Sequence, residues 1–323
     1  MISQQARYQG CLMGLAVGDA LGTSVEFQVP NTFVPMTDMV GGGVFGLAKG
    51  QWTDDTSMAL CLAESLLECD GFNARDQMER YTRWWQQGYL SSTGTCFDIG
   101  NTVSQALALY AATGNPLAGS TNPQSAGNGS LMRLASIPLF YANNPEQAIS
   151  MSADSSKTTH GAVACVDACR LLGGLIVGAI QGVSKETLLS SEYTPVARLW
   201  DEKPLCGEIR AIGQGSFKQK SPPAILGSGY VVQSLEAALW AFHHSSSFEE
   251  GCLMAVNLGN DADTTGAIFG QLAGAFYGIS GIRQDWASCI TNNTFILELA
   301  ERLCERSQYQ DTKGGSSCVA RCV

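Results

Sequence analysis

Two short stretches of the chain, far apart in sequence, combine carboxylates with hydroxyl side chains directly before an apolar run. The first is Thr53-Asp54-Asp55-Thr56, and the second is Asp261-Ala262-Asp263-Thr264. Adjacent carboxylates repel one another, so a fold that places them together needs a cation, a proton or a hydrogen-bond network to hold them. The polar side chains of both stretches offer only oxygen, a donor set that selects Mg²⁺, Mn²⁺ or Ca²⁺ over zinc or copper. Together the stretches predict one all-oxygen metal site.

The number of acids favours a pair of ions. The two stretches hold four carboxylates, Asp54, Asp55, Asp261 and Asp263, which is more than a single Mg²⁺ ordinarily takes. Two ions a few ångströms apart would use all four, and a fifth acid, Asp98, could complete or bridge the pair. The alternative role is helix capping, because the first turn of a helix favours acids and hydroxyls. The separated repeat favours coordination, and the two roles are compatible.

The elements that must position these acids are predicted to be helices. Apolar residues recur at helical spacing in a series of segments, of which the first is 5–22 and the last is 286–306. We find no persuasive alternation of apolar and polar residues that would indicate a strand. A Gly- and Pro-rich loop over 29–51 leads into the first acidic stretch. We predict an all-α, compact single-domain orthogonal bundle of ten or more helices over 1–306, with the metal site at helix N-termini and loops. A loosely ordered tail is predicted over 307–323.

The first predicted helix carries glycines four residues apart on one face, Gly10, Gly14 and Gly18. Glycine destabilises a helix interior by about 1 kcal/mol relative to alanine, so the spacing predicts the close approach of another helix. Glu26 follows this helix on a loop. Taken alone, a single glutamate in a loop is typical of solvated surface.

Bulk composition excludes some classes of partner. The chain has 323 residues and a net charge of −10, which excludes a general nucleic-acid binder because such affinity rests on Lys and Arg. Its twelve cysteines contain no CxxC pair, which favours reduced core residues over disulfides or a zinc site. The apolar run at 171–180 is shorter than the about twenty residues of a membrane span, and we expect no signal peptide. We therefore predict a cytoplasmic monomer without a nucleic-acid or membrane partner.

Three further features are candidates for substrate contacts. Asp98 lies at the start of a predicted helix, where capping is the simple alternative. The loop Gly127-Asn128-Gly129-Ser130 has the composition of a backbone nest that offers N–H groups to a phosphate or hydroxyl. His160 lies in the first turn of a helix predicted over 157–183, where a single histidine is more typical of packing or capping than of catalysis.

Six short motifs occur in a fixed order along the chain. They are Gly18-Asp19-Ala20-Leu21-Gly22 with Glu26, Trp52-Thr53-Asp54-Asp55-Thr56, Asp98 with Gly100-Asn101-Thr102, Gly127-Asn128-Gly129-Ser130, His160-Gly161 and Gly259-Asn260-Asp261-Ala262-Asp263-Thr264. This order resembles the ADP-ribosylglycohydrolase family, which includes the dinitrogenase reductase activating glycohydrolase. Each motif alone is weak, but six in order are highly specific, and the resemblance covers about residues 6–305.

The resemblance implies an enzyme with two Mg²⁺ or Mn²⁺ ions. Its activity would be hydrolysis of the α-glycosidic bond at ribose C1″ of an ADP-ribosylated protein substrate, releasing ADP-ribose. The implied metal ligands are Thr53, Asp54, Asp55, Asp261, Asp263 and Thr264. The implied catalytic acids are Asp98, which lies beside the metals and contacts water or the ribose, and Glu26, a catalytic or substrate-gating acid on a mobile loop. The implied substrate-binding residues are Asn101, Gly127, Asn128, Gly129, Ser130, His160 and Tyr230, with the loop 127–130 around the diphosphate.

Alternatives remain open from sequence. The protein could hydrolyse a small ADP-ribose conjugate such as O-acetyl-ADP-ribose, or be a non-enzymatic relative that binds ADP-ribose or serves a structural role. Loss of some of these acids would be the mark of a non-enzymatic relative, and all the acids are present. The residues do not distinguish arginine, serine or another linkage, Mg²⁺ from Mn²⁺, or which of Asp98 and Glu26 is the general acid or base. They also leave open whether Thr53 is a ligand or only a cap.

Overall fold

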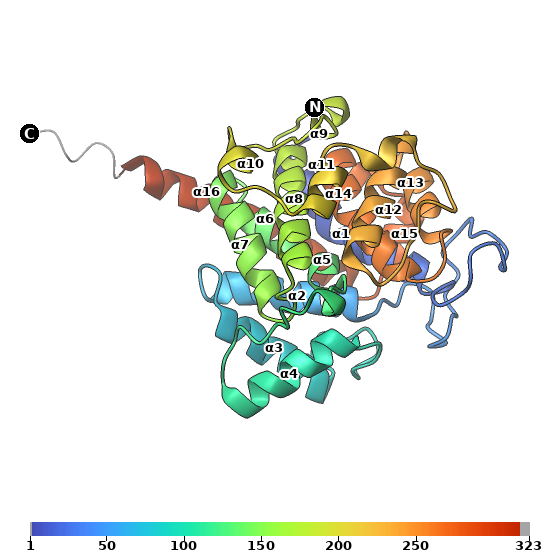
Figure 1. Ribbon diagram of the computed structural model, residues 1–323. Coiled ribbons are helices and arrows are strands. Elements are labelled where there is room, and N and C mark those ends of the chain that lie inside the picture. The colour runs from blue at the N-terminus through green and yellow to red at the C-terminus, as the bar shows by residue number, and fades with distance from the viewer. Residues whose placement is uncertain (1, 317–323) are drawn as a thin grey trace, which may run out of the picture.

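The computed structural model of the protein describes residues 2–316, and all regular elements in this range are helical (Figure 1). The elements are α1 (Gln4–Gly22), α2 (Asp54–Glu68), α3 (Ala74–Gln87), α4 (Asn101–Thr113), η1 (Pro123–Ser125), α5 (Gly129–Met132), α6 (Ser136–Phe140), α7 (Pro145–Lys157), α8 (Val163–Ile180), α9 (Lys185–Leu188), α10 (Leu199–Glu202), α11 (Gly207–Gly213), η2 (Ser216–Gln219), α12 (Val231–His244), α13 (Phe248–Val256), α14 (Ala262–Tyr277), η3 (Ile279–Gly281), α15 (Gln284–Cys289) and α16 (Asn293–Ser316). The predicted all-α bundle of ten or more helices is confirmed.

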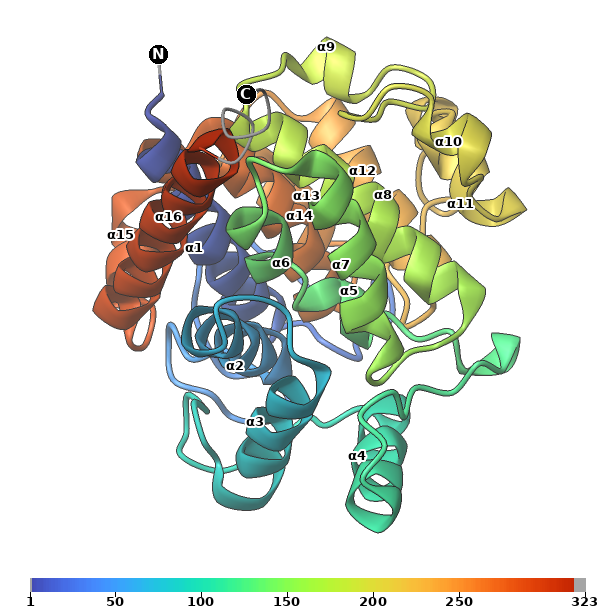
Figure 2. The ribbon, with the colours of Figure 1, turned by 90° about the vertical axis from the view of Figure 1, so that its left-hand side faces the viewer.

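The centre of the bundle is the pair α1 and α14, whose backbones touch. A Cβ atom added to Gly14 would lie 2.3 Å from the carbonyl oxygen of Gly270, and one added to Gly18 would lie 2.1 Å from that of Gly266. The glycines therefore allow an approach that any side chain would prevent, as their spacing predicts. Figure 2 shows α1 in the interior of the molecule, in contact with α14 and α16.

This close approach carries the end of α1 onto the start of α14. A Cβ atom added to Gly22 would lie 2.3 Å from the Cα atom of Asp263. One of the two acidic stretches is therefore held against the loop that follows α1, which carries Glu26. The absence of a side chain at Gly22 thus allows the acids from these two distant segments to meet.

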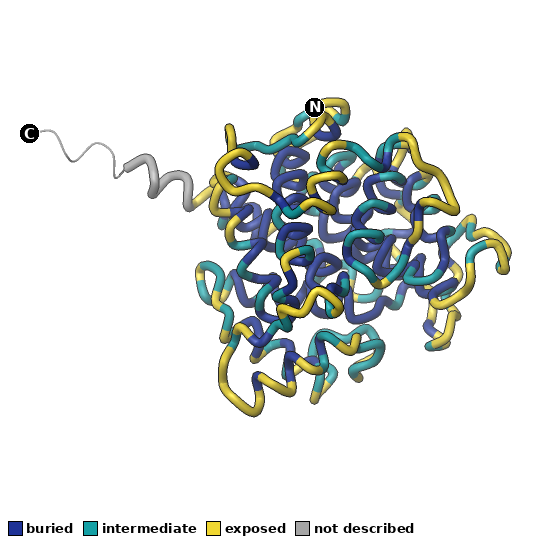
Figure 3. Tube along the Cα trace, in the orientation of Figure 1, coloured by how far each residue is buried: buried dark blue, intermediate teal, exposed yellow. Residues whose placement is uncertain are grey.

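The apolar side chains of the bundle form a large central core and a smaller cluster beside it. Figure 3 shows the buried chain running through the middle of the molecule and the exposed chain around it. The smaller cluster joins α2 to α3 and α4, at one end of the molecule, through side chains such as Met58, Tyr81 and Leu107. At this end of the bundle, the N-termini of α2 and α4 reach the same cleft.

Helix α8 is the one helix of the described chain that is long and apolar enough to cross a membrane by length and composition. However, 78% of this 18-residue segment is buried inside the protein. That burial is typical of a core helix, which needs an apolar surface on most of its circumference. The helix was predicted from sequence over 157–183, and its shorter observed span changes the setting of His160.

The last helix is longer than its apolar pattern indicates. The sequence places its end at Arg306, followed by a tail, whereas α16 continues to Ser316. The first ten residues of the predicted tail are therefore helical, and the remainder, residues 317–323, lies outside the described residues. All ten cysteines in the described part of the chain are free thiols, in agreement with the absence of a disulfide pattern.

Candidate active site and metal centre

The two acidic stretches meet at one cleft of about 840 Å³. Six candidate metal-binding or catalytic side chains line it, namely Glu26, Asp54, Asp98, Asp261, Asp263 and Thr264. Thr53 and Asp55 are fully buried next to them. The Thr53 hydroxyl lies 3.3 Å from an oxygen of Asp55 and 3.3 Å from an oxygen of Asp263. Residues separated by two hundred positions are therefore in direct contact, as the repeated pattern predicts.

The side chains at the helix starts do not cap the helices. Thr53 is the N-cap residue of α2 and Asp261 that of α14, but neither side chain accepts a hydrogen bond from its own helix. The Thr53 hydroxyl points to Asp55 and Asp263, and the Thr264 hydroxyl lies 3.4 Å from Asp55 Oδ2. Capping alone therefore does not explain why these residue types occur here, since their oxygens converge on one another.

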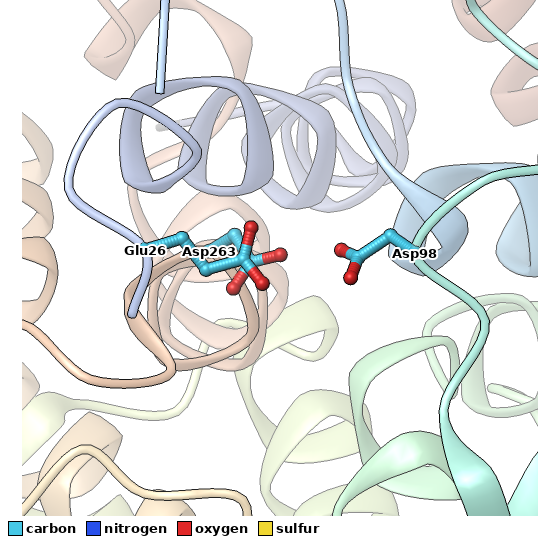
Figure 4. A group of neighbouring side chains, drawn as sticks. All are labelled: Glu26, Asp98 and Asp263. Atoms are coloured by element: carbon cyan, nitrogen blue, oxygen red, sulfur yellow. The ribbon is translucent and has the colours of Figure 1, made fainter. Parts of the chain in front are cut away.

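Several carboxylate oxygens in the site lack a hydrogen-bond partner although they are buried. They are Oε2 of Glu26, Oδ1 of Asp55 and Oδ1 of Asp263. One carboxylate oxygen from each of Glu26, Asp98 and Asp263 lies within 4.8 Å of the other two. Figure 4 shows Asp98 pointing across a gap toward the neighbouring Glu26 and Asp263. Buried oxygens without donors are costly, and oxygen-coordinated divalent cations would satisfy them, so the residues fit a metal centre.

Six carboxyl groups form an acidic cluster. The pKa values within it also favour a bound cation. The cluster is defined as Glu26, Asp54, Asp55, Asp98, Asp261 and Asp263. Burial, followed by repulsion from neighbouring carboxylates, raises the pKa of Asp54, Asp55 and Asp263 well above the usual value. The same two causes raise the pKa of Asp98 to about 7 and that of Glu26 to about 9. Among the described residues, no lysine or arginine forms an ion pair with the cluster. The described part of the chain therefore supplies no ion-pairing partner for these carboxylates.

Asp19 is a part of the site to which the sequence assigned no role. Its Oδ1 accepts hydrogen bonds from the backbone N–H and the hydroxyl of Thr53, at 2.9 and 3.0 Å. Its Oδ2 accepts from the N–H and hydroxyl of Thr56, at 3.0 and 2.6 Å. Asp19 therefore caps α2 from α1 and takes the hydroxyl hydrogen of Thr53, so that the Thr53 oxygen lies 3.3 Å from Asp55 and from Asp263 without a hydrogen to give them. The signal in the sequence was an aspartate inside an apolar helical pattern, since an unpaired carboxylate would not be buried there.

Replacing Asp19 by asparagine should weaken metal binding without touching a ligand. The amide keeps one acceptor oxygen but turns an NH₂ group toward donors, so the start of α2 loses its anchor. Outer-shell partners of this kind typically change metal affinity or activity about 10- to 100-fold. Calorimetric titration with Mn²⁺ measures the effect, with Asp154→Asn on the surface of α7 as the matched control. Equal Mn²⁺ affinity in Asp19→Asn and wild type would show that Asp19 does not position the ligands.

The backbone is strained at three positions around the cleft. Phe27, Asp98 and Asn260 have positive φ angles of 60°, 57° and 54°, a region that costs non-glycine residues about 1–3 kcal/mol. Two backbone hydrogen bonds join two of these positions, from Phe27 N–H to the Asn260 carbonyl and from Asn260 N–H to the Gln28 carbonyl. They fasten the loop of Glu26 to the turn before Asp261. Such strain persists where surrounding contacts determine the geometry, as at functional sites.

The loop at 127–130 borders the cleft but only part of it is open to a ligand. The N–H of Gly127 donates to the carbonyl of Ser125, and that of Asn128 donates to the carbonyl of Gly229. The Asn128 side chain also donates to Asp261 Oδ2 at 2.8 Å. Within the described chain, the N–H groups of Gly129 and Ser130, at the start of α5, have no acceptor. The nest interpretation from sequence therefore holds for two of the four residues at most.

The other predicted substrate residues do not all line the cleft. Asn101 and His160 line the cleft. The Ser130 side chain is buried, with its Oγ 2.8 Å from the Oγ of Ser156. The Tyr230 hydroxyl donates to Glu208 at 2.9 Å, and Tyr230 is not among the residues that line the cleft.

The predicted helical setting of His160 is wrong. Helix α7 ends at Lys157 and α8 begins at Val163, so His160 lies in the connection between them. There its N–H donates to the carbonyl of Ser156 at 2.7 Å. The sequence-based helix began too early because this connection is held by a tertiary contact that the local pattern does not show, the bond from the N–H of Gly161 to the carbonyl of Ser120 at 2.9 Å.

A family model described as ADP-ribosylglycohydrolase matches residues 2–313. The chain belongs to the ADP-ribosylglycohydrolase family. The family resemblance drawn from the motifs is thereby confirmed.

Relatives of known name agree with the family assignment. The chain is 41% identical to "ADP-ribosylarginine hydrolase Tri1" of Pseudomonas putida (strain GB-1), over 94% of this chain and 80% of that one. It is 30% identical to "ADP-ribosyl-[dinitrogen reductase] glycohydrolase" of Rhodospirillum rubrum, over 87% and 89%. A solved structure titled "ADP-ribosylglycohydrolase-related protein complex" shares 42% identity with a TM-score of 0.83, covering 95% of this chain and all of that chain. The protein is a hydrolase of this family with the family's all-α fold.

Proposed function

We propose that the protein hydrolyses the α-glycosidic bond at C1″ of ADP-ribose attached to a protein side chain, with two Mg²⁺ or Mn²⁺ ions as cofactors. The observation that carries the proposal is the convergence of two distant acidic stretches on buried carboxylate oxygens that have no donor. The residues proposed to hold the ions are Thr53, Asp54, Asp55, Asp261, Asp263 and Thr264. The acidic cluster is complete, which argues against a non-enzymatic binding protein.

The bound cations would orient the ribose hydroxyls and act as Lewis acids while positive charge develops at C1″. The chain's own part is proton transfer by two carboxyl groups that lie on the cleft. Asp98 lies across the gap from Glu26 and Asp263, where its carboxylate can accept a proton from the attacking water. Glu26, on the other side of that gap, can donate a proton to the leaving atom.

We propose arginine as the modified side chain. The relatives at 41% and 40% identity, from P. putida and Serratia proteamaculans, are both named ADP-ribosylarginine hydrolases. The ring of Phe27 borders the cleft next to Glu26 and is 6.4 Å from that of Phe45, which is 5.3 Å from that of Phe97. Aromatic rings beside unpaired carboxyl groups suit a planar cation such as guanidinium.

The test of the proposed function is a panel of ADP-ribosyl peptides. With Mg²⁺ present, we expect ADP-ribose release from an arginine-linked peptide and much slower release from serine- and acid-linked peptides. The same assay in excess chelator should show none. Hydrolysis of O-acetyl-ADP-ribose alone would favour the small-conjugate alternative. Calorimetric binding of ADP-ribose without turnover of any substrate would favour a binding protein.

A cytoplasmic location and a monomeric state complete the proposal. The ten free cysteines of the described chain support a reducing compartment. The net charge of −10 argues against nucleic acid as a partner. Fractionation of the producing cell and size-exclusion chromatography with light scattering test these two points.

A further inference from the structure

Arg133, in the connection between α5 and α6, is a buried cation surrounded by neutral groups. Only 1% of its surface is exposed. One terminal nitrogen donates to the hydroxyls of Thr159 at 2.6 Å and Thr158 at 3.4 Å, and the other faces the sulfur of Met58 at 3.8 Å. The guanidinium also lies over the ring of Tyr81, 4.6 Å from its centre, and its Nε has no partner. Burying a charge without a carboxylate is costly, so a compensating role is expected.

The Thr159 hydroxyl connects Arg133 to His160. Thr159 is fully buried, and its oxygen lies 2.8 Å from Nδ1 of His160. A guanidinium can only donate, so the contact with Arg133 occupies a lone pair of the hydroxyl oxygen. The hydroxyl hydrogen then has one available acceptor among the described contacts, which is Nδ1 of His160. The opposite arrangement, with a hydrogen on Nδ1, leaves the hydroxyl hydrogen without an acceptor in a buried place, which is unfavourable.

The histidine ring is neutral, so this arrangement decides which nitrogen carries its hydrogen. Burial, followed by repulsion from Arg133, lowers the pKa of His160 to about 3. If Nδ1 accepts from Thr159, the single ring hydrogen of a neutral imidazole resides on Nε2. Nε2 faces the loop at 127–130, because a Cβ atom added to Gly129 would lie 3.2 Å from it. A side chain at Gly129 would therefore cover the nitrogen that the cleft exposes.

We propose that Arg133 is a positioning residue that acts through Thr159. It fixes His160 as the tautomer with hydrogen on Nε2 and so presents a hydrogen-bond donor to the cleft. This donor lies beside the loop that carries the unused N–H groups of Gly129 and Ser130. Three donors, with the charge of Arg133 behind one of them, suit an anionic oxygen ligand. That this ligand is the diphosphate of ADP-ribose rests on the proposed function.

The tautomer can be measured directly in the full-length protein. The chain has only three histidines, so ¹⁵N-histidine labelling gives few signals, and their loss in His160→Gln assigns those of His160. The long-range proton–nitrogen correlation pattern of the ring separates the two neutral tautomers. We expect wild-type His160 to show hydrogen on Nε2 at neutral pH. Hydrogen on Nδ1 in the wild-type protein would by itself overturn the proposal.

Variants of Thr159 test the contacts that run from Arg133 through the Thr159 hydroxyl to His160. Thr159→Val removes the hydroxyl, and we expect a mixture of tautomers or the Nδ1–H form, while Thr159→Ser should restore the wild-type pattern. An unchanged pattern in Thr159→Val would overturn the role of the hydroxyl. Thr113→Val, at the exposed end of α4, is the matched control for a lost threonine hydroxyl.

Binding of ADP-ribose, measured by calorimetry, supplies the functional readout. We expect about 10-fold weaker binding by Thr159→Val, and binding within twofold of the wild type by Thr159→Ser and Thr113→Val. Wild-type affinity in Thr159→Val would overturn the donor role of His160. If the wild type itself does not bind ADP-ribose, the proposed function fails. The tautomer measurement then still shows whether Arg133 and Thr159 fix the tautomer of His160.

Discussion

The Asp55→Asn variant is expected to release ADP-ribose from an arginine-linked peptide roughly 10³-fold more slowly than the wild type at saturating Mg²⁺. Asp55 is fully buried, its Oδ1 has no hydrogen-bond donor, and its Oδ2 lies 3.3 Å from the hydroxyl oxygen of Thr53 and 3.4 Å from that of Thr264. An amide at this position removes a formal charge from the metal centre. It also replaces one of the two carboxylate oxygens by an NH₂ group, which donates hydrogen bonds and does not accept them. The loss therefore falls on turnover, measured under saturating substrate.

The same substitution should stabilise the metal-free protein. Without cations, burial and the neighbouring carboxylates disfavour ionised Asp55, and a neutral amide removes that repulsion. In excess chelator, we expect Asp55→Asn to melt at a higher temperature than the wild type, and added Mg²⁺ should raise its melting temperature less. Asp201→Asn, an exposed position on α10, is the control. A variant that melts lower in chelator and keeps full activity would refute the assignment of Asp55 as a metal ligand.

Removal of metal should make stability depend steeply on pH. In the metal-free protein, burial and like-charge repulsion raise the pKa of Asp98 to about 7 and of Glu26 to about 9. The folded state then holds these protons more tightly than the unfolded chain, so their stabilising contribution is fully present below the unfolded pKa values of about 4. It is lost as pH rises through the folded values. We therefore expect the melting temperature in chelator to fall between about pH 5 and about pH 9.

Added Mg²⁺ should oppose this fall. Cation binding favours the ionised carboxylates and releases protons, so its stabilising effect is largest at high pH. Thermal melting across this range, with chelator and with Mg²⁺, measures both slopes. The Glu26→Gln variant should flatten the high-pH part of the metal-free curve, since it removes a group whose pKa is raised to about 9. A melting temperature in chelator that rises with pH over this window would contradict the assigned electrostatics.

Local patterns in the sequence were sufficient for the helical class of the fold and for the residue types of the site, although not for the bounds of α8 and α16. Apolar spacing indicates helices because a helix places every third or fourth residue on one face. Glycines at every fourth position of α1 imply a close neighbour, and the carbonyls of Gly266 and Gly270 occupy that space. Two clusters of acids and hydroxyls before apolar runs indicated a shared oxygen site, since buried carboxylates need a cation or a proton. These inferences depend on side-chain chemistry and near neighbours along the chain.

The partner of each buried polar group depended on contacts between segments far apart in the chain. Asp19 caps α2 from another helix, and the N–H of Asn128 is taken by Gly229. Tyr230 is bound to Glu208, and His160 is joined to Arg133 through Thr159. A hydrogen bond requires two groups to meet within about 3 Å in the correct orientation, and spacing along one helix does not specify that meeting. The packing of α1 against α14 brings the acids together, and tertiary contacts then assign which oxygens are held by the protein and which face the cleft.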